Sequence, residues 1–491
     1  MSPVPGLQDK VQEVIEAAIK ADLHENTSFY GSCAEGFTGP GLPTEANSMP
    51  PDVRVTYPSG EVFVYGDIPA SDIQPLFDLK AMFETWDRII KQAFDRWLEL
   101  PEPSSFDGRL ATLQAVAAGL AVSGVTVNES GSETEVEVGN SDLETWVADI
   151  QAEMNDYEGI AFEVLNDSYL SRLDNVLSGQ HAIATVLGVA IASEQEVWKR
   201  AREDILHLAE EARKAFEEVA SGGGGTLKGS LSIFGAFLGA IGVFATGGAA
   251  LVVGSLGAAT GIVTSFMPDA QEPPEIELGG VDVVDVHGNM LSAVSEANRT
   301  LGGEEQTAYL TIMSVMDTVQ ARLDSFDFGT PVDFLGENRP GELYAPAENV
   351  ILLMDGLREV AAKVKVISTT LATVNGDLAG VVGSTPWERD AILGYGGHIG
   401  YYRTWEQLHS MLTNVLQRSS VALGELAARM ILVANDFQRT EEQIEADLLA
   451  LTRDLPDPTP RDQVPYGFQS GWTGPLPLDG RDESAAPKRA S

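Results

Sequence analysis

Apolar residues recur at alternating steps of three and four in four long segments of the chain, residues 197–219, 288–326, 349–382 and 402–451. The clearest seam, in the third segment, has ten members: Val350, Leu353, Leu357, Val360, Val364, Ile367, Leu371, Val374, Leu378 and Val381. This spacing places an apolar stripe along one side of an α-helix. Because long helices with narrow stripes pack close to antiparallel, the pattern predicts a mainly α fold built as an elongated antiparallel bundle.

The first 140 residues have a more mixed pattern. Helical periodicity is visible over residues 3–21, 73–100 and 108–122. Residues 53–65 and 124–139 instead show pairs of short alternating runs on either side of a turn. Two such runs around a Pro/Gly or Asn/Ser/Gly turn are typical of a β-hairpin. We therefore expect one or two small β-hairpins beside the helices.

Stretches rich in Gly or Pro divide the chain into four parts. We expect a mixed α/β region over residues 1–140 and a helical bundle over 141–330. A helical hairpin follows over 348–452, and a tail over 456–491. The tail has seven prolines in 36 residues and few aliphatic side chains, a composition that predicts disorder.

One segment has no charge at all. Residues 229–268 contain no Asp, Glu, Lys or Arg, although 21% of the whole chain is charged. The apolar part, residues 231–267, is too long for one membrane-spanning helix, which needs about 20 residues. It is a little short for two full spans, but it is long enough for two β-strands of about 10 residues each. Its apolar and glycine residues are the candidate membrane-contacting set: Leu231, Phe234, Gly235, Phe237, Gly239, Phe244, Gly247, Gly248, Val252, Gly257, Gly261 and Phe266.

Two interpretations of this segment remain open. In one, the hairpin meets a membrane, because only Ser and Thr give it any polar edge. The glycine pairs spaced four apart would let helices approach closely in lipid. In the other, the hairpin is a permanent part of the core, wrapped by the acidic helices. The breakers on either side, 222–225 and 268–274, are the expected hinges if the segment moves.

Composition narrows the partners and the compartment. The chain has 73 acidic and 31 basic residues, a net charge of −42. This field repels phosphate, so we expect no nucleic acid partner. The single cysteine, Cys33, excludes a framework of intramolecular disulfides. Residues 1–25 carry seven charges and no long apolar run, unlike a signal peptide. We therefore expect either a cytoplasmic protein or one exported by a leaderless route.

A helical bundle with one long apolar hairpin, over residues 142–330, resembles the α-helical pore-forming toxins such as cytolysin A and the helical haemolysin components. This resemblance is of architecture and has no sequence motif. It implies a soluble form that holds the hairpin against the bundle. It also implies a membrane-bound form that extrudes the hairpin and assembles into a homo-oligomer.

Residues 349–451 resemble the Trp-x-Gly helical-hairpin family of type VII secretion substrates. The family's second helix ends with Tyr followed four residues later by Asp or Glu, and here Phe437 and Glu441 hold those places. The resemblance implies an export signal at these two residues. The chain departs from the family in having Phe for Tyr, and its connector has Trp387-Glu-Arg and Gly394-Tyr-Gly-Gly397 instead of Trp-x-Gly. Phe437 also fits the apolar seam of its own helix, so core packing is the other interpretation.

The sequence shows no constellation that indicates catalysis or a bound metal or cofactor. The six histidines, at positions 24, 181, 207, 287, 398 and 409, form no i, i+4 pair, and we expect most of them at the surface or at interfaces. No H-E-x-x-H, G-x-S-x-G, phosphate-loop or EF-hand motif is present. We therefore expect a protein that is not an enzyme and holds no metal or cofactor.

Taken together, these patterns predict a secreted helical protein that acts at a membrane or cell envelope through an extrudable apolar hairpin. The partners expected are a lipid membrane and the secretion machinery or another helical protein. The alternative is a non-enzymatic scaffold or partner-binding protein of a type VII-like secretion system, in which the hairpin stays buried.

Overall fold

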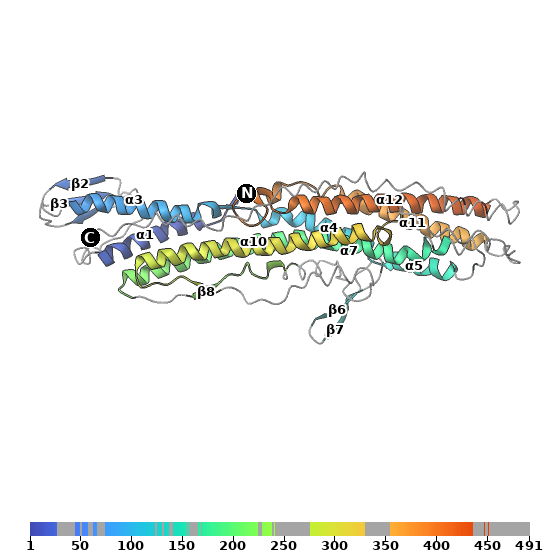
Figure 1. Cartoon of the computed structure of the whole chain (residues 1–491), viewed down its shortest axis with the longest axis horizontal. Coiled ribbons are helices and arrows are strands. Elements are labelled where there is room, and N and C mark those ends of the chain that lie inside the picture. The colour runs from blue at the N-terminus through green and yellow to red at the C-terminus, as the bar shows by residue number, and fades with distance from the viewer. Residues whose placement is uncertain are drawn as a thin grey trace.

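The protein is an elongated helical bundle in the computed structural model (Figure 1). The structure describes residues 1–26, 45–49, 52–56, 62–65, 74–122, 125–129, 132–136, 141–154, 157, 165–167, 169–223, 228–237, 240, 275–328, 354–435, 446 and 450. Helices dominate this part of the chain, and small antiparallel strand pairs lie beside them. The predicted mainly α class with small β-hairpins is confirmed.

Two long helices form the spine of the bundle. Helix α7 spans Leu173–Ala220 and helix α10 spans Val283–Ala321, and the two pack along one another. At 1.5 Å per residue, α7 is roughly 72 Å long. It ends where Gly222 adopts a left-handed conformation, φ 75°, and the N–H groups of Gly222 and Gly223 cap the carbonyls of Val219 and Glu218, as in a Schellman motif.

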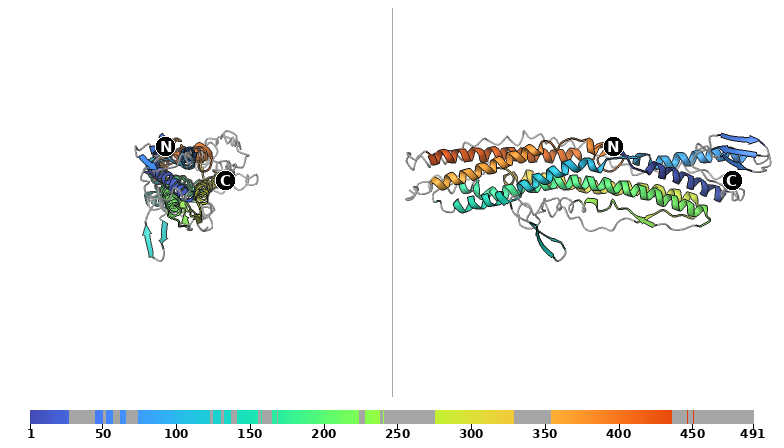
Figure 2. Two further views of the ribbon diagram at one scale, coloured as in Figure 1. Left: turned by 90° about the vertical axis from the view of Figure 1, so that its left-hand side faces the viewer. Right: turned by 180° about the vertical axis from the view of Figure 1, so that it is seen from behind.

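Shorter helices cover the two ends of the spine. One end holds α1 (Leu7–Asn26) and α3 (Gln74–Phe94), and the other holds α4 (Asp107–Leu120), α5 (Ser141–Met154), α11 (Met354–Leu378) and α12 (Tyr402–Asn435). Helices α11 and α12 pack as a pair, and α4, α5 and α7 lie against them. The views in Figure 2 show the same lengthwise arrangement from the end and from behind. One apolar core runs from Val4 to Ala434 through all of these helices.

The strands are short and lie at the margins of the bundle. The pairs are β1 (Ser2–Pro3) with β5 (Glu99–Leu100), β2 (Glu45–Met49) with β3 (Asp52–Thr56), β3 with β4 (Val62–Tyr65), β6 (Val125–Glu129) with β7 (Ser132–Val136), and β8 (Lys228–Ser230) with β9 (Glu275–Glu277). Short 3-10 helices lie at Asp95–Trp97, Pro103–Phe106, Leu170–Arg172, Leu323–Ser325, Thr385–Trp387 and Gly397–Ile399. The two predicted hairpins are present as β3–β4 and β6–β7, and the latter projects from the side of the bundle (Figures 1 and 2).

The predicted apolar seams agree with the observed helices, with one notable extension. The seam over 197–219 is only the second half of α7. The first half shows no seam because every residue from 177 to 194 is buried. A helix that is surrounded on all sides is apolar all round and loses its periodic stripe. The predicted tail over 456–491 lies outside the described residues.

Most histidines were expected at the surface or at interfaces, and two of them are core residues instead. His181 on α7 and His409 on α12 are both buried. Burial lowers the pKa of His181 to about 4, so this imidazole is neutral at physiological pH. His409 stacks on Trp405, with ring centroids 5.3 Å apart. Both rings pack as core residues because an uncharged imidazole costs far less to bury than a charged one.

Candidate functional site

Two short strands bracket the uncharged segment. Strands β8 and β9, which flank residues 231–274, are paired antiparallel with Gly229 opposite Ile276. Lys228 and Glu275 also form an ion pair of 3.0 Å beside this ladder. The two ends of residues 231–274 are therefore held close together by β8 and β9. The next element after β9 is α10.

The structure places four of the twelve candidate membrane-contacting residues, and all four lie at the start of the segment. Leu231 and Phe237 are buried, whereas Phe234 and Gly235 are half-buried. The remaining eight, from Gly239 to Phe266, lie outside the described residues. The same is true of the predicted export-signal residues, Phe437 and Glu441.

A carboxylate on α7 holds the first turn of the uncharged segment. Asp204 Oδ1 accepts hydrogen bonds from the Ser232 N–H (2.9 Å) and from the Ser232 hydroxyl (2.7 Å). Its other oxygen accepts the Ile233 N–H at 2.8 Å. Asp204 is only 4% exposed, so these bonds form where water competes weakly. Hydrogen bonds to a buried carboxyl group are among the stronger ones in proteins.

A second carboxylate, on α10, holds the next residues from the other side. Glu304 accepts the Gly235 N–H and the Phe237 N–H, both at 2.9 Å. Gly235 has φ 76°, a left-handed conformation that a side chain would strain. This turn brings the two N–H groups to the same carboxylate.

A guanidinium on α7 completes the arrangement by binding the carbonyls of the same turn. Arg200 donates to Ser232 O at 2.9 Å and to Phe234 O at 3.3 Å. It is oriented by Glu196, one helical turn earlier, at 2.8 Å. Arg200, Asp204 and Glu304 are referred to below as the clasp. Every one of these clasp bonds except that to the Ser232 hydroxyl involves the backbone of the uncharged segment, so the clasp can hold it without any charge on the segment itself.

The clasp could not be identified from the sequence. Asp204 and Glu304 are two of 73 acidic residues, and nothing in their neighbours distinguishes them. One weak signal exists for Asp204, which sits beside the seam residues Ala201 and Ile205 and is therefore directed toward the interior of the bundle.

A second charged cluster lies in the core beside the clasp. Glu194 of α7, Glu305 of α10 and Arg389 of the connector between α11 and α12 all have side chains with 0% exposure. One terminal nitrogen of Arg389, Nη1, donates to Glu194 at 3.2 Å and also to Glu305. The other, Nη2, donates to Glu305 at 2.8 Å. The guanidinium therefore bridges two carboxylates that belong to different helices.

The surroundings of this cluster shift the protonation of its carboxyl groups. Burial raises the pKa of Glu194, and it raises the pKa of Glu305 well above its usual range. The Arg389 guanidinium acts in the opposite direction on both groups. Burial also raises the pKa of the neighbouring Tyr401 phenol. Two carboxyls and one guanidinium would carry a net negative charge in the core, so proton uptake by the pair is favoured.

The connector is fixed to the bundle around this cluster. Tyr395 accepts from Arg389 through its carbonyl (2.5 Å), and its N–H donates to Glu305 at 2.6 Å. Asn298 of α10 accepts the Gly394 N–H at 2.8 Å. The Gly-rich connector between α11 and α12 is therefore bound to the bundle. Trp387, Arg389 and Tyr395 are the residues that hold it there.

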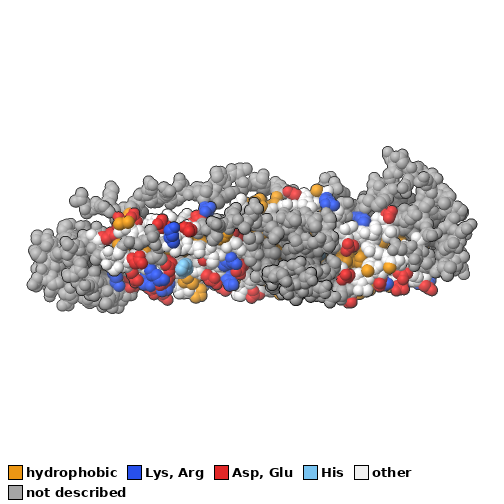
Figure 3. Space-filling view, turned by 90° about the horizontal axis from the view of Figure 1, so that it is seen from below, with side chains coloured by type: hydrophobic (Ala, Val, Ile, Leu, Met, Phe, Trp, Pro, Cys, Tyr) orange, Lys and Arg blue, Asp and Glu red, His pale blue; other side chains and the backbone are white. Residues whose placement is uncertain are grey.

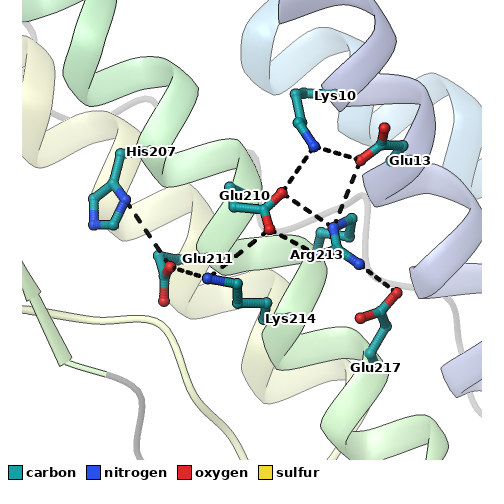
Figure 4. Close-up of polar contacts among 8 residues, drawn as sticks. All are labelled: Lys10, Glu13, His207, Glu210, Glu211, Arg213, Lys214 and Glu217. Atoms are coloured by element: carbon teal, nitrogen blue, oxygen red, sulfur yellow. Dashed lines mark hydrogen bonds and ion pairs between the residues drawn. The ribbon is translucent and has the colours of Figure 1, made fainter.

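Charged side chains of both signs intermix on the outer face of the bundle where α1, α7 and α10 lie (Figure 3). Figure 4 shows the network that joins α1 to α7. Glu210 lies at its centre, 3.0 Å from Lys10 of α1 and 2.7 Å from Arg213. Its hydrogen bonds to Arg213 and Lys10 lower the pKa of Glu210 to about 2. This network consists of ion pairs at the surface that link α1 to α7, and it does not form a binding site.

The described residues offer little for a metal site or a membrane span. Within the described residues, no group of three or more His, Cys, Asp or Glu side chains is placed to hold a metal ion. Among the described helices, one, over Leu165–Ala220, has a stretch with mean hydropathy 1.5, apolar and long enough to cross a membrane, and that stretch is completely buried. A core helix passes the same test, so this is weak evidence for a span.

Comparison with known proteins identifies no relative of this chain. No family model matches the chain, and no similar protein is found among curated proteins or solved structures.

Proposed function

We propose that this protein acts at a membrane or cell envelope by releasing its uncharged segment, residues 231–267, from the clasp and inserting it into lipid. The observation that carries the proposal is the clasp itself. Charged residues of two helices hold the start of an uncharged segment almost entirely through its backbone, and β8–β9 pairing closes the loop at its base. The active form would be a homo-oligomer, because one hairpin cannot enclose a polar path through a bilayer.

The clasp supplies much of the free energy that holds the segment in its docked position. A hydrogen bond to a charged group contributes roughly 1.5–3 kcal/mol net, so the clasp stabilises the docked state substantially. The segment itself is apolar, and the transfer of its Leu, Ile, Phe and Val side chains into lipid is favourable. Loss of one clasp carboxylate would therefore weaken docking without altering the part that enters the membrane.

A disulfide between the clasp and the segment tests the proposal. Asp204→Cys and Ser232→Cys, introduced with Cys33→Ser, would tie the segment to α7, where these side chains now lie within hydrogen-bonding distance. We expect no dye release from liposomes by the oxidised variant and release after reduction. The matched control is Lys228→Cys with Glu277→Cys, which closes the β8–β9 base and leaves the segment free to move. This control should release dye in both redox states.

Two results would contradict the proposal. One is dye release by the oxidised Asp204→Cys/Ser232→Cys protein at the rate of its reduced form. The other is the absence of release by wild type and by every variant, at pH 5 to 8 and on both anionic and neutral liposomes.

Export is part of the same proposal. A protein secreted to act at a membrane needs an export signal, and Phe437 and Glu441 hold the places of the type VII signature in the sequence that follows α12. Cell fractionation checks this. Replacing both residues by Ala should retain the protein in the cytoplasm, whereas secretion at the wild-type level would show that the pair is not an export signal.

A non-enzymatic scaffold with a permanently buried hairpin is the second candidate. It is favoured by the burial of Leu231, Ile233 and Phe237, which pack as ordinary core residues. Gly239→Asp with Gly257→Asp separates the two. If the hairpin is always buried, the two new charges should unfold the protein. If it is released to act, the variant should stay folded and lose dye release.

A further inference from the structure

Helices α7 and α10 are bridged twice, through neighbouring residues of α10 and through residues ten positions apart on α7. The first bridge is the uncharged segment, held by Asp204 from α7 and by Glu304 from α10. The second is Arg389, which binds Glu194 of α7 and Glu305 of α10. Because Glu304 and Glu305 are consecutive residues, any movement of α10 that changes one bridge must also change the other.

The charges of the second bridge are unbalanced. Two carboxyl groups contribute to this cluster, Glu194 from α7 and Glu305 from α10. The connector contributes Arg389 and the backbone of Tyr395, and Tyr401 lies at the start of α12. Among these described groups, Arg389 is the one cation. Among the described residues, its Nε and the Glu194 Oε2 have no hydrogen-bond partner, so Arg389 binds the two carboxyls through its terminal nitrogens alone.

Removing the guanidinium would leave two buried carboxyls on facing helices. In a medium of low dielectric constant, two like charges a few ångströms apart repel strongly. The helices then have two responses. They separate, or the carboxyls take up protons, and the second response requires a lower pH.

We infer that Arg389 is a positioning residue that sets the spacing of α7 and α10 at which Asp204 and Glu304 can hold the uncharged segment together. Docking of the connector between α11 and α12 thereby controls whether the segment is held. A partner that pulls this connector away would open the clasp. The functional meaning of this opening rests on the proposed function, but the structural coupling does not.

Arg389 also has a role in packing that must be separated from its charge. The guanidinium lies over the Trp198 ring, 5.2 Å from its centroid, and a substitution removes this contact too. Two variants make the separation. Arg389→Lys keeps a positive charge without the fork of donors. The triple variant Arg389→Gln/Glu194→Gln/Glu305→Gln removes the guanidinium and both carboxyls together.

Amide hydrogen exchange of residues 231–240 is the direct test, because the clasp protects the N–H groups of Ser232, Ile233, Gly235 and Phe237. For Arg389→Gln we expect protection to fall about tenfold or more at pH 8, where the two carboxyls lose protons more readily, and by much less at pH 5, where protonation relieves their repulsion. The triple variant and Arg389→Lys should stay within about threefold of wild type at both values. Protection of α11 and α12 amides reports whether each variant is folded.

The inference is overturned if Arg389→Gln leaves protection unchanged at pH 8. It is also overturned if the loss is equal at pH 5 and pH 8 and persists in the triple variant, or if Arg389→Lys loses as much protection as Arg389→Gln. Should Arg389→Gln unfold at pH 8, the pair of Arg389→Lys and the triple variant decides by the same criteria. Dye release is then measured on the same samples. Loss of protection without any release would leave the coupling in place and contradict the proposed function instead.

Discussion

Gly179 of α7 packs against the ring of Phe326, a residue that follows the end of α10. A β-carbon at position 179 would come within 2.6 Å of Phe326 Cδ1. The next residue, Gln180, donates to the Phe326 carbonyl at 2.9 Å and to the Ser419 hydroxyl at 2.8 Å. At this level a single helical turn of α7 fixes both the exit of α10 and the middle of α12.

Gly179→Ala should therefore destabilise the protein although alanine favours helices. The Phe326 ring must move out of its pocket, and overpacking of this kind costs typically 1–3 kcal/mol. Chemical denaturation followed by circular dichroism measures the loss. The control is Gly303→Ala on α10, where a β-carbon meets nothing within 4 Å; this change should stabilise by up to about 1 kcal/mol. Equal effects of the two substitutions would show that the Phe326 contact is unimportant.

The charged cluster in the core predicts an unusual dependence of stability on pH. The pKa of Glu194 is raised in the folded protein, so between its ordinary value of 4.5 and the folded value the native state binds more protons than the unfolded state. Stability attributable to this group is full below about pH 4.5 and falls as pH rises through the folded pKa. Glu194→Gln keeps the acceptor for Trp198 and Arg389 and removes the titration. Relative to wild type, the variant should gain stability as the pH rises from 5 to 8.

Denaturation at several pH values, with Glu203→Gln as a control, checks this. Glu203 is exposed on the same helix, so its substitution should leave the slope unaltered. A Glu194→Gln protein that is less stable than wild type by the same amount at every pH would mean that the carboxylate is needed for its bonds and is ionised throughout.

The surface network around Glu210 predicts the opposite slope. Its pKa is lowered to about 2 from an ordinary value near 4.5, so its stabilising contribution is present above pH 4.5 and is lost as pH falls toward 2. Glu210 is part-exposed, at 26%, and solvent screens such pairs. Glu210→Gln should therefore cost only about 1 kcal/mol at pH 7. The cost should vanish near pH 2 and shrink in about 1 M salt, and a cost that ignores both variables would contradict the ion-pair account.

The helices could be predicted because each has one buried side, and that side appears in the sequence as a periodic apolar stripe. Helices α10, α11 and the second half of α7 are examples. The first half of α7 left no such record, since residues 177–194 are buried on every side. The clasp was not predictable for a different reason. Asp204 and Glu304 act on backbone N–H groups of a distant segment, and a backbone partner leaves no trace in the sequence of that segment.

The connector shows the same limit in another form. Its glycines and Pro386 indicate a link between helices, and that interpretation is correct as far as it goes. The docking depends on Arg389, whose partners Glu305 and Glu194 are 84 and 195 positions away. It also depends on Trp387, whose ring contacts Phe106 and Tyr401. Periodicity cannot reveal pairs of this separation, because it reports only neighbours on one helix.

Trp387 offers a final test of how the connector is held. The indole is 0% exposed and its ring meets Tyr401 at 4.9 Å and Phe106 at 5.7 Å between centroids. Its Nε1 has no hydrogen-bond partner in the part of the chain that the structure describes, whereas Trp405 Nε1 donates to the Leu187 carbonyl at 3.1 Å. Trp387→Phe should therefore cost less than Trp405→Phe by about 1 kcal/mol, the usual worth of one buried hydrogen bond.

Trp387→Ala, by contrast, empties the pocket and should cost about 3–5 kcal/mol. Denaturation of the three variants under one condition gives the ranking directly. If Trp387→Phe were the more damaging of the two Phe substitutions, its indole N–H would have to be bonded in solution. In that case the connector would be held by a polar contact at this position, and aromatic packing would be a secondary contribution.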